Sequence, residues 1–281
     1  MAISMTHLFV TIMLLAAHTA LAETNMLQDL CVADLKGSKV NGYPCKDPSQ
    51  VTPEDFYYMG LANAADTSNT SMGSAVTAGN VEKIPGLNMM GTSMSRIDYA
   101  PGGLNPPHLH PRASEAIFVL EGSLFVGFLT TSGKLISKHV NKGDVFAFPR
   151  ALLHFQQNPN KTPASVIAAF DSQNPGTQSV GPSLFGANPP IPDDLLAKAF
   201  SLGTNDIQNI KGKALLHFQQ NPNKTPASVI AAFDSQNPGT QSVGPSLFGA
   251  NPPIPDDLLA KAFSLGTNDI QNIKGKFQPK K

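Results

Sequence analysis

Two histidines one residue apart, His108 and His110, and the nearby carboxylate of Glu115 are well placed to bind a metal ion. In an extended strand, side chains at positions i and i+2 point to the same face, so both imidazoles can be directed at one point. Pro111 cannot donate to a strand ladder and should interrupt the run there. We therefore expect Glu115 to return to the same point from the next strand, which would bring three ligands to one cation.

A second stretch, residues 143–158, adds a fourth ligand. It holds an apolar run, a turn at Pro149, and His154 on the strand that follows. A lone histidine of this kind is more often packed or solvated than a ligand, but here it completes a set of three imidazoles and one carboxylate. Mixed nitrogen and oxygen donors without a thiolate suit Mn, Fe, Ni or Zn, and two positions of a six-coordinate ion would remain for water or substrate. Asn105 and Asn158 would either support the ligands or face the substrate, or else form turns.

The two stretches resemble the two signature motifs of the cupins. The residues that carry the resemblance are Gly102, His108, His110, Glu115, Gly122, Gly143, Pro149, His154 and Asn158. Residues 101–115 are more similar still to one branch, the germins and germin-like proteins of plants. Shorter stretches at 27–34, 69–74 and 172–176 agree with that branch, so the resemblance covers residues 27 to about 213.

The resemblance implies a fold, a cofactor and an assembly. The fold would be all-β, the cupin jelly-roll β-barrel, followed by a C-terminal helical segment that clasps neighbouring subunits. The cofactor would be Mn²⁺, held by His108, His110, Glu115 and His154. The assembly would be a homo-oligomer, as a hexamer, and the partner would be a small molecule such as superoxide or a small carboxylate.

Three functions fit this resemblance. The first is dismutation of superoxide at the metal, an activity of many germin-like proteins. The second is oxidation of oxalate to carbon dioxide and hydrogen peroxide, the activity of germins proper. Oxalate oxidases carry an Asn just before the Arg of the strand at 93–98, where this chain has Ser95, and a hydroxyl offers one donor in place of an amide's two. The third is a non-enzymatic extracellular protein of the cell wall, or a receptor-like protein.

The N-terminus predicts export. Residues 1–22 have the form of a secretory signal peptide, because the apolar run at 8–17 is too short to span a bilayer and Ala20-Leu21-Ala22 has the small-x-small form of a cleavage site. No second apolar run of about 18 residues follows, so we expect no membrane anchor. Lys plus Arg equal Asp plus Glu at 20 each, which disfavours a nucleic-acid partner. We expect a protein of the extracellular space, the apoplast or cell wall.

Export bears on two covalent features. An exported chain with an even number of cysteines normally pairs them, and in germins the cysteines that match Cys31 and Cys45 close an N-terminal loop; two free thiols are the alternative. Asn69 opens an N-glycosylation sequence in a polar stretch, and Asn160 opens a second one.

Short β-rich runs separated by turn residues predict the barrel. The strand candidates are residues 93–99, 116–120, 124–129, 134–140, 145–148, 152–156 and 164–170. Residues 193–200 have apolar positions at helical spacing and two acids in the first turn, so we expect a helix there and a short second helix at 205–210.

The chain then repeats itself, because residues 151–213 recur without a mismatch as residues 214–276. Natural repeats drift apart, so two identical copies indicate a recent tandem duplication or an artefact of assembly, and one copy fewer leaves an ordinary germin length. We divide the chain into a signal peptide (1–22), a germin-like cupin domain (23–213), and a duplicated copy with a short Lys-rich end (214–281) that is not an independent domain.

Proximity decides which copy should complete the barrel. The first copy follows the strand and turn that lead into His154, so His217 of the second copy should not be a ligand. The second copy would keep an unpaired strand at 227–233, and we expect a protease-sensitive tail beyond about Gly212. The family's second motif has a Gly where the first copy begins with Ala151; if that position takes a positive φ, Ala costs on the order of 1 kcal/mol.

Overall fold

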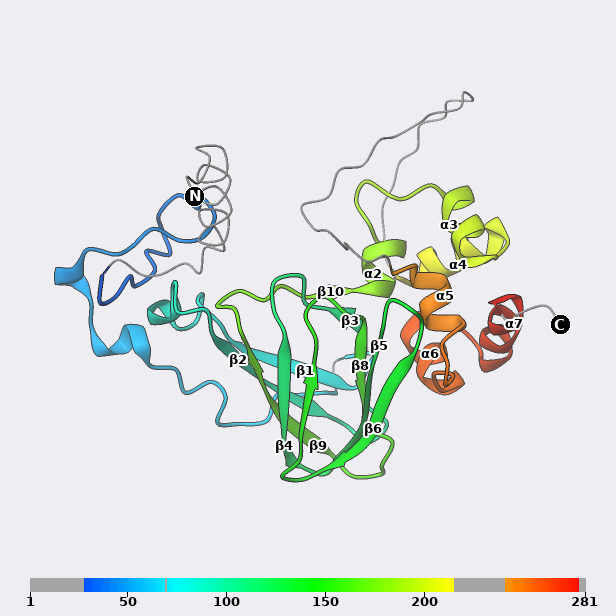
Figure 1. Ribbon diagram of the computed structural model, residues 1–281, viewed down its shortest axis with the longest axis horizontal. Coiled ribbons are helices and arrows are strands. Elements are labelled where there is room, and N and C mark those ends of the chain that lie inside the picture. The colour runs from blue at the N-terminus through cyan, green and yellow to red at the C-terminus, as the bar shows by residue number, and fades with distance from the viewer. Residues whose placement is uncertain (1–27, 69, 215–240, 278–281) are drawn as a thin grey trace, which may run out of the picture.

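The computed structural model describes the chain except for residues 1–27, 69, 215–240 and 278–281 (Figure 1). The expected signal peptide, the glycosylation candidate Asn69, His217 and the strand at 227–233 all lie outside the described residues.

Two five-stranded sheets face each other and form a jelly roll (Figure 1). The first sheet has the order β1 (Ser74–Gly79), β2 (Ser93–Tyr99), β9 (Ala164–Phe170), β4 (Glu115–Glu121) and β7 (Val145–Phe148). The second has the order β10 (Gln178–Ser179), β3 (Leu104–Leu109), β8 (His154–Gln157), β5 (Ser123–Leu129) and β6 (Leu135–Asn141). All pairs within the sheets are antiparallel, and the predicted jelly-roll barrel with C-terminal helices is confirmed.

Alternate residues of the strands fill the space between the sheets. Val119, Leu124, Val126 and Val166 each have 0% of their surface exposed, as expected where every second side chain points inward. Each such apolar side chain contributes about 1.5–3 kcal/mol to folding, so the two sheets form a rigid frame for any residue at their inner face.

The strand β3 is the irregular one. It contains Pro106 and Pro107, which cannot donate ladder hydrogen bonds, and its register against β8 shifts between Asn105 and His108. Beyond the shift, His108 lies directly opposite His154. The sequence predicted an extended strand at His108 and His110 that ends at Pro111, and β3 confirms it up to Leu109; the bulge, which was not predicted, sets the position of both histidines.

In the described part of the chain, six helices lie beside one end of the second sheet (Figure 1). They are α2 (Val180–Phe185), α3 (Asp193–Phe200), α4 (Thr204–Ala214), α5 (Val243–Phe248), α6 (Asp256–Phe263) and α7 (Thr267–Phe277). Of these, α2 and α6 contact the sheet. The first three belong to the first copy of the repeat, and the last three to the second copy.

Residues 243–277, the helical part of the second copy, do not form the tail that we expected. The first copy supplies β8 and β9, as proximity predicted, but α5–α7 pack against the barrel and against α2–α4 in one apolar cluster with Leu104, Leu153 and Phe155. The reason is that these helices carry an apolar face of their own, which is stabilised by burial.

The N-terminal segment contains a disulfide and three short 3₁₀ helices. Cys31 and Cys45 are bonded, which confirms the predicted pairing. The 3₁₀ helices are η1 (Pro48–Gln50), η2 (Pro53–Phe56) and η3 (Pro85–Leu87).

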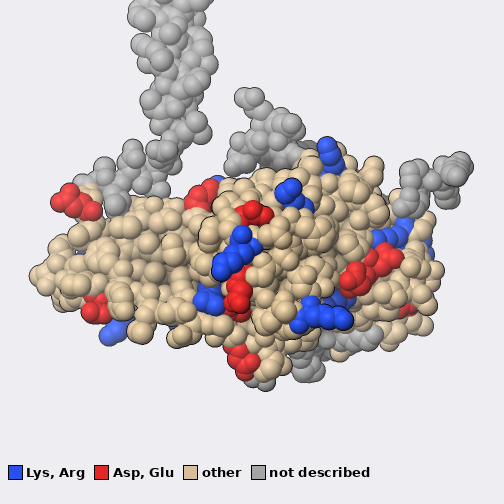
Figure 2. Space-filling model, turned by 90° about the horizontal axis from the view of Figure 1, so that it is seen from below, with Lys and Arg blue, Asp and Glu red and all other residues tan. Residues whose placement is uncertain are grey.

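On the face seen in Figure 2, basic and acidic side chains are interspersed. Within the described part of the chain, no helix combines the length and the apolar character that crossing a bilayer requires.

Candidate metal centre

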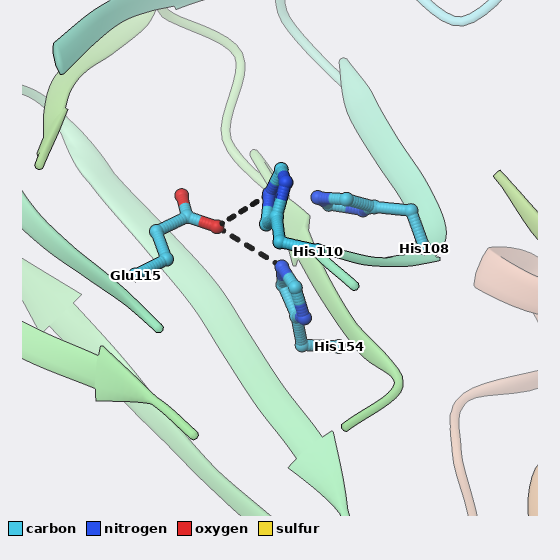
Figure 3. Close-up of side chains that lie close together, drawn as sticks. All are labelled: His108, His110, Glu115 and His154. Atoms are coloured by element: carbon cyan, nitrogen blue, oxygen red, sulfur yellow. Dashed lines mark hydrogen bonds and ion pairs between the residues drawn. The ribbon is translucent and has the colours of Figure 1, made fainter. Parts of the chain in front are cut away.

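Four side chains from three strands and one loop meet inside the barrel (Figure 3). His108 lies on β3, His110 directly follows that strand, Glu115 opens β4 and His154 opens β8. All four are buried, with at most 6% of their surface exposed, and their ligand atoms lie within 4.8 Å of one another. The structure thus brings together the four predicted ligands as a group that could hold a metal ion.

Glu115 is the hub of the group. Its Oε2 lies 3.1 Å from Nε2 of His110 and 3.0 Å from Nε2 of His154 (Figure 3). The ring centroids of His108 and His154 are 4.2 Å apart, and the Phe148 ring stacks on His154 at 4.6 Å. The imidazoles are therefore held by packing as well as by polar contacts.

Backbone carbonyls hold the outer nitrogen of each imidazole. Nδ1 of His108 donates to the carbonyl of Pro106 at 2.7 Å, Nδ1 of His154 donates to that of Leu152 at 2.9 Å, and Nδ1 of His110 donates to that of Gly176. A carbonyl oxygen only accepts, so each Nδ1 carries the proton and Nε2 of each neutral ring has a lone pair. This is the arrangement in which a protein presents imidazole to a metal.

The donor set fits a divalent cation. With Nδ1 protonated, Nε2 of His110 and of His154 each direct a lone pair at a carboxylate oxygen about 3 Å away. Acceptors in contact repel one another, and a divalent cation bound between them would replace this repulsion by attraction. The alternative, a proton on each of these nitrogens, would place additional positive charges in a buried site, which is costly.

The environment keeps the ligands in their binding forms. Burial, reinforced by the neighbouring His154, lowers the pKa of His108 to about 3, so this imidazole is neutral at ordinary pH. Burial alone would raise the pKa of Glu115, but positive charge on the side that faces His110 and His154 outweighs it and holds that pKa well below its usual range. Without a metal, protons on Nε2 of these rings would supply the charge, and a bound cation would take over that role. Neutral imidazole and ionised carboxylate are the forms that coordinate metals.

A row of buried, hydrogen-bonded polar side chains contacts Oε1 of Glu115, the oxygen that does not face His110 and His154. Gln156 donates to Oε1 of Glu115 at 3.3 Å, while its own Oε1 accepts from Asn105 at 2.7 Å and from the hydroxyl of Tyr99 at 3.2 Å. Asn105 therefore supports a ligand through Gln156. Gln156 was not among the residues predicted from the sequence, although it lies two residues after His154 and hence on the same face of β8.

Asn158 and Asn160 have turn-forming roles. The Asn158 amide donates to the carbonyls of Ala100 at 3.0 Å and Thr162 at 2.8 Å, so it shapes the loop and does not contact the four candidate ligands. Asn160 donates its Nδ2 to Ser123 and to Asn158. Since Nδ2 is the atom that a glycan would modify, these bonds disfavour glycosylation at Asn160 and leave Asn69 as the better candidate.

A cavity of about 270 Å³ opens onto the group. Its walls include His108, His110 and Glu115, together with Asn105 and Ser95. The position at which oxalate oxidases were expected to differ thus faces the same space as the candidate ligands.

Ala151, in the turn before His154, has φ = +59°. This is the left-handed conformation that favours glycine, so the cost that the sequence predicted for an alanine with a positive φ applies to Ala151. The Ala151 amide donates to the carbonyl of His110 at 3.2 Å, which couples this turn to a candidate ligand.

A jelly roll that encloses three histidines and a glutamate at this spacing is typical of cupins, and a cupin family profile matches residues 59–208 and 212–271. Germin-like protein subfamily 2 member 3 of Arabidopsis thaliana is 80% identical over 214 residues, which cover 76% of this chain and 98% of that relative. Germin-like protein 5-1 of Oryza sativa subsp. japonica is 58% identical over 201 residues, 71% of this chain and 90% of that relative.

Solved structures agree. A recombinant oxalate oxidase in complex with glycolate superposes with a TM-score of 0.66 at 45% identity, covering 69% of this chain and 98% of that one. The chain belongs to the germin-like proteins of the cupin family.

Proposed function

We propose that this chain is an exported, manganese-binding germin-like cupin that dismutes superoxide at His108, His110, Glu115 and His154. The observation that carries the proposal is the buried set of three imidazoles and one carboxylate, with each Nδ1 bonded to a carbonyl, at the wall of a small cavity. A redox-active metal, when bound, would supply the alternating oxidation and reduction by which two superoxide ions and two protons become one dioxygen and one hydrogen peroxide.

Charge supports a small anionic substrate. Three neutral imidazoles, one carboxylate and a divalent ion sum to one positive charge in a buried site, where the low dielectric strengthens its attraction for an anion. Mixed nitrogen and oxygen donors are compatible with Mn²⁺, and the germin resemblance selects that ion among the alternatives. The side chains of Ser95 and Asn105 would contact whatever enters the cavity.

Oxalate oxidation is the second candidate. It is favoured by the presence of Asn105 at the cavity wall and by the oxalate oxidases among the similar solved structures. It is disfavoured by Ser95, whose hydroxyl reaches less far into the cavity than an amide and offers fewer donors. A non-enzymatic wall or receptor-like role is the third candidate, in which the metal would only hold the barrel closed.

Export, glycosylation and assembly complete the proposal. The signal peptide, the disulfide and the sequence at Asn69 support an extracellular protein of the apoplast or cell wall. The germin resemblance implies a hexamer. We propose a small molecule as the partner, and neither a nucleic acid nor a membrane.

Metal-loaded protein assayed with superoxide and with oxalate separates the three functions. We expect dismutation and no oxalate oxidation by the wild type, and loss of both metal and dismutation in Glu115→Gln. Glu121→Gln, at the exposed end of the same strand, is the matched control and should keep both. Activity on oxalate alone would reverse the ranking, and inactivity on both substrates with manganese bound would favour the non-enzymatic role. Ser95→Asn should strengthen inhibition of dismutation by oxalate.

A further inference from the structure

The two copies of the repeat have the same sequence but different surroundings. Leu258 on α6 has 0% of its surface exposed, whereas its counterpart on α3, Leu195, is 55% exposed. Ile254 and Leu247 are likewise fully buried, while their counterparts Ile191 and Leu184 are only partly buried. The second copy therefore buries a helical face that remains exposed in the first copy.

What covers this face in the second copy is the barrel. The α6 helix packs against β3, and Asp257 on it accepts a hydrogen bond from Gln157 of β8 at 3.1 Å. Lys261 donates to the carbonyl of Gly102, and the backbone of Asn251 exchanges hydrogen bonds with Gly133 and Leu135. Among the counterparts in the first copy, Lys198 is exposed whereas Lys261 is half-buried, while Asp194 and Asn188 are exposed, as Asp257 and Asn251 are.

The two helical units meet in a two-fold arrangement. The ring of Phe185 contacts that of Phe263 at 6.2 Å, and the ring of Phe200 contacts that of Phe248 at 6.3 Å, in nearly perpendicular pairs. Phe185 and Phe248 occupy the same position of the repeat, as do Phe200 and Phe263. Residue i of one unit thus contacts residue j of the other, and j contacts i, which defines an isologous interface between two identical partners.

Applying this two-fold relation to the whole molecule would place a second barrel against α2–α4, in the way the first barrel lies against α5–α7. We propose that α5–α7 is an internal cap: on the barrel of its own chain it occupies the docking site for α2–α4 of a second copy of this chain. The cap thereby prevents the reciprocal dimer in which each barrel would receive the α2–α4 unit of its neighbour.

Tethering decides the competition in favour of the cap. An identical unit on the same chain has an effective concentration on the order of millimolar, so at micromolar protein it outcompetes the unit of another chain by about a thousandfold. The relative in Arabidopsis, 98% of which matches 214 residues of this chain, has the length of a barrel with one helical unit. A chain without residues 214–276 should therefore fold and should have an uncovered docking site. The cap would alter the hexamer expected from the resemblance, because it removes one contact on which assembly could depend.

The test is the molar mass in solution at about 10 µM protein, from light scattering on a sizing column. We expect the full chain to be a monomer, and the chain lacking residues 214–276 to have twice the mass of its monomer or a multiple of that. In the full chain, Leu258→Asp should displace the cap and produce dimers, whereas Leu195→Asp, the same change in the same local sequence, should leave a monomer. The double variant should be monomeric again, because its free barrel meets no intact docking face.

Several outcomes would overturn the proposal. A full chain that is already dimeric or larger and is dissociated by Leu195→Asp would show that the cap does not block docking. A deletion chain that keeps the circular dichroism of a β-barrel but stays monomeric would show that α2–α4 does not dock on a second barrel. If Leu258→Asp unfolds the chain, the deletion chain alone decides between these results.

Discussion

At the scale of single residues, the site depends on the outer nitrogens of its histidines. Carbonyls from three separate segments, at Pro106, Leu152 and Gly176, hold Nδ1 of the three rings. These bonds fix both the tautomer and the ring plane, so the inner nitrogens need no reorganisation to bind a cation. None of the three carbonyls could be recognised from the sequence, because every residue type has the same backbone carbonyl.

The repeat offers a matched test of the ligand set. We predict that His154→Ala lowers bound metal per chain by at least tenfold, whereas His217→Ala, the same change in the same local sequence, leaves it unchanged. The measurement is elemental analysis of the purified proteins. Loss of metal in the His217 variant instead would mean that the second copy supplies the ligand.

Gln156 provides a test of support for a ligand. We predict that Gln156→Leu weakens metal binding about tenfold, because Oε1 of Glu115 loses its donor, and lowers stability by roughly 1–3 kcal/mol, because the buried Tyr99 hydroxyl loses its acceptor. Metal titration and denaturant unfolding measure the two effects. Gln219→Leu, its counterpart in the second copy, is the control, and an equal effect there would contradict the assignment.

At the scale of elements, the turn before β8 decides how His154 enters the site. Ala151 opens the first copy of the repeat in the left-handed region, whereas Ala214 opens the second copy as the last residue of α4. The first residue of the repeat thus has a different backbone conformation in each copy, because the strand before Ala151 and the bond to His110 impose the turn on the first copy.

This difference predicts opposite effects of one substitution. Ala151→Gly should relieve the left-handed strain and raise the free energy of unfolding by about 1 kcal/mol, or about 2–4 °C in Tm. Ala214→Gly should give no gain, since glycine does not favour a helix. Thermal unfolding of both variants is the measurement, and equal shifts would argue against strain at Ala151.

Asp55 anchors the N-terminal segment in a pH-dependent manner. It accepts from the Thr52 amide at 2.9 Å and from Lys46 at 3.0 Å, and these two groups hold the pKa of its carboxyl below the usual 3.8. Because the folded pKa is the lower one, the stabilisation is present in full above the unfolded value and is lost as the pH falls through the folded value.

We predict that Asp55→Asn lowers the free energy of unfolding by roughly 1–2 kcal/mol at pH 7. The difference from the wild type should shrink as the pH falls below about 4. Denaturant unfolding at several pH values measures this. A difference that is unchanged at pH 3 would mean that the ionised carboxylate is not responsible.

At the scale of the whole molecule, one apolar cluster joins the barrel to six helices from two copies of one sequence. We predict that Leu258→Ala costs about 2–5 kcal/mol, because it leaves a cavity between α6 and the barrel. Leu195→Ala should stay within about 0.5 kcal/mol in the monomer, because that side chain is 55% exposed. Chemical denaturation compares them, and equal costs would place α3 and α6 in equivalent surroundings.

The sequence by itself determined which residues form the candidate metal centre. His108, His110 and Glu115 were found from spacing, since alternation along a strand and a proline break are local properties, whereas His154 was found by pairing the stretch 143–158 with the first stretch and by their resemblance to the two cupin motifs. The disulfide followed from a count of cysteines in an exported chain, and most strands followed from β-rich runs between turn residues.

Only the tertiary structure decided the surroundings of these residues. The bulge at Pro106, the support from Gln156 and the turn-forming role of Asn158 depend on contacts between segments that are distant in the chain. The repeat shows the reason most directly, because its helices have the same sequence in both copies and yet bury different faces. Local pattern sets what a segment can form, and the partners that the fold brings to it decide what it buries.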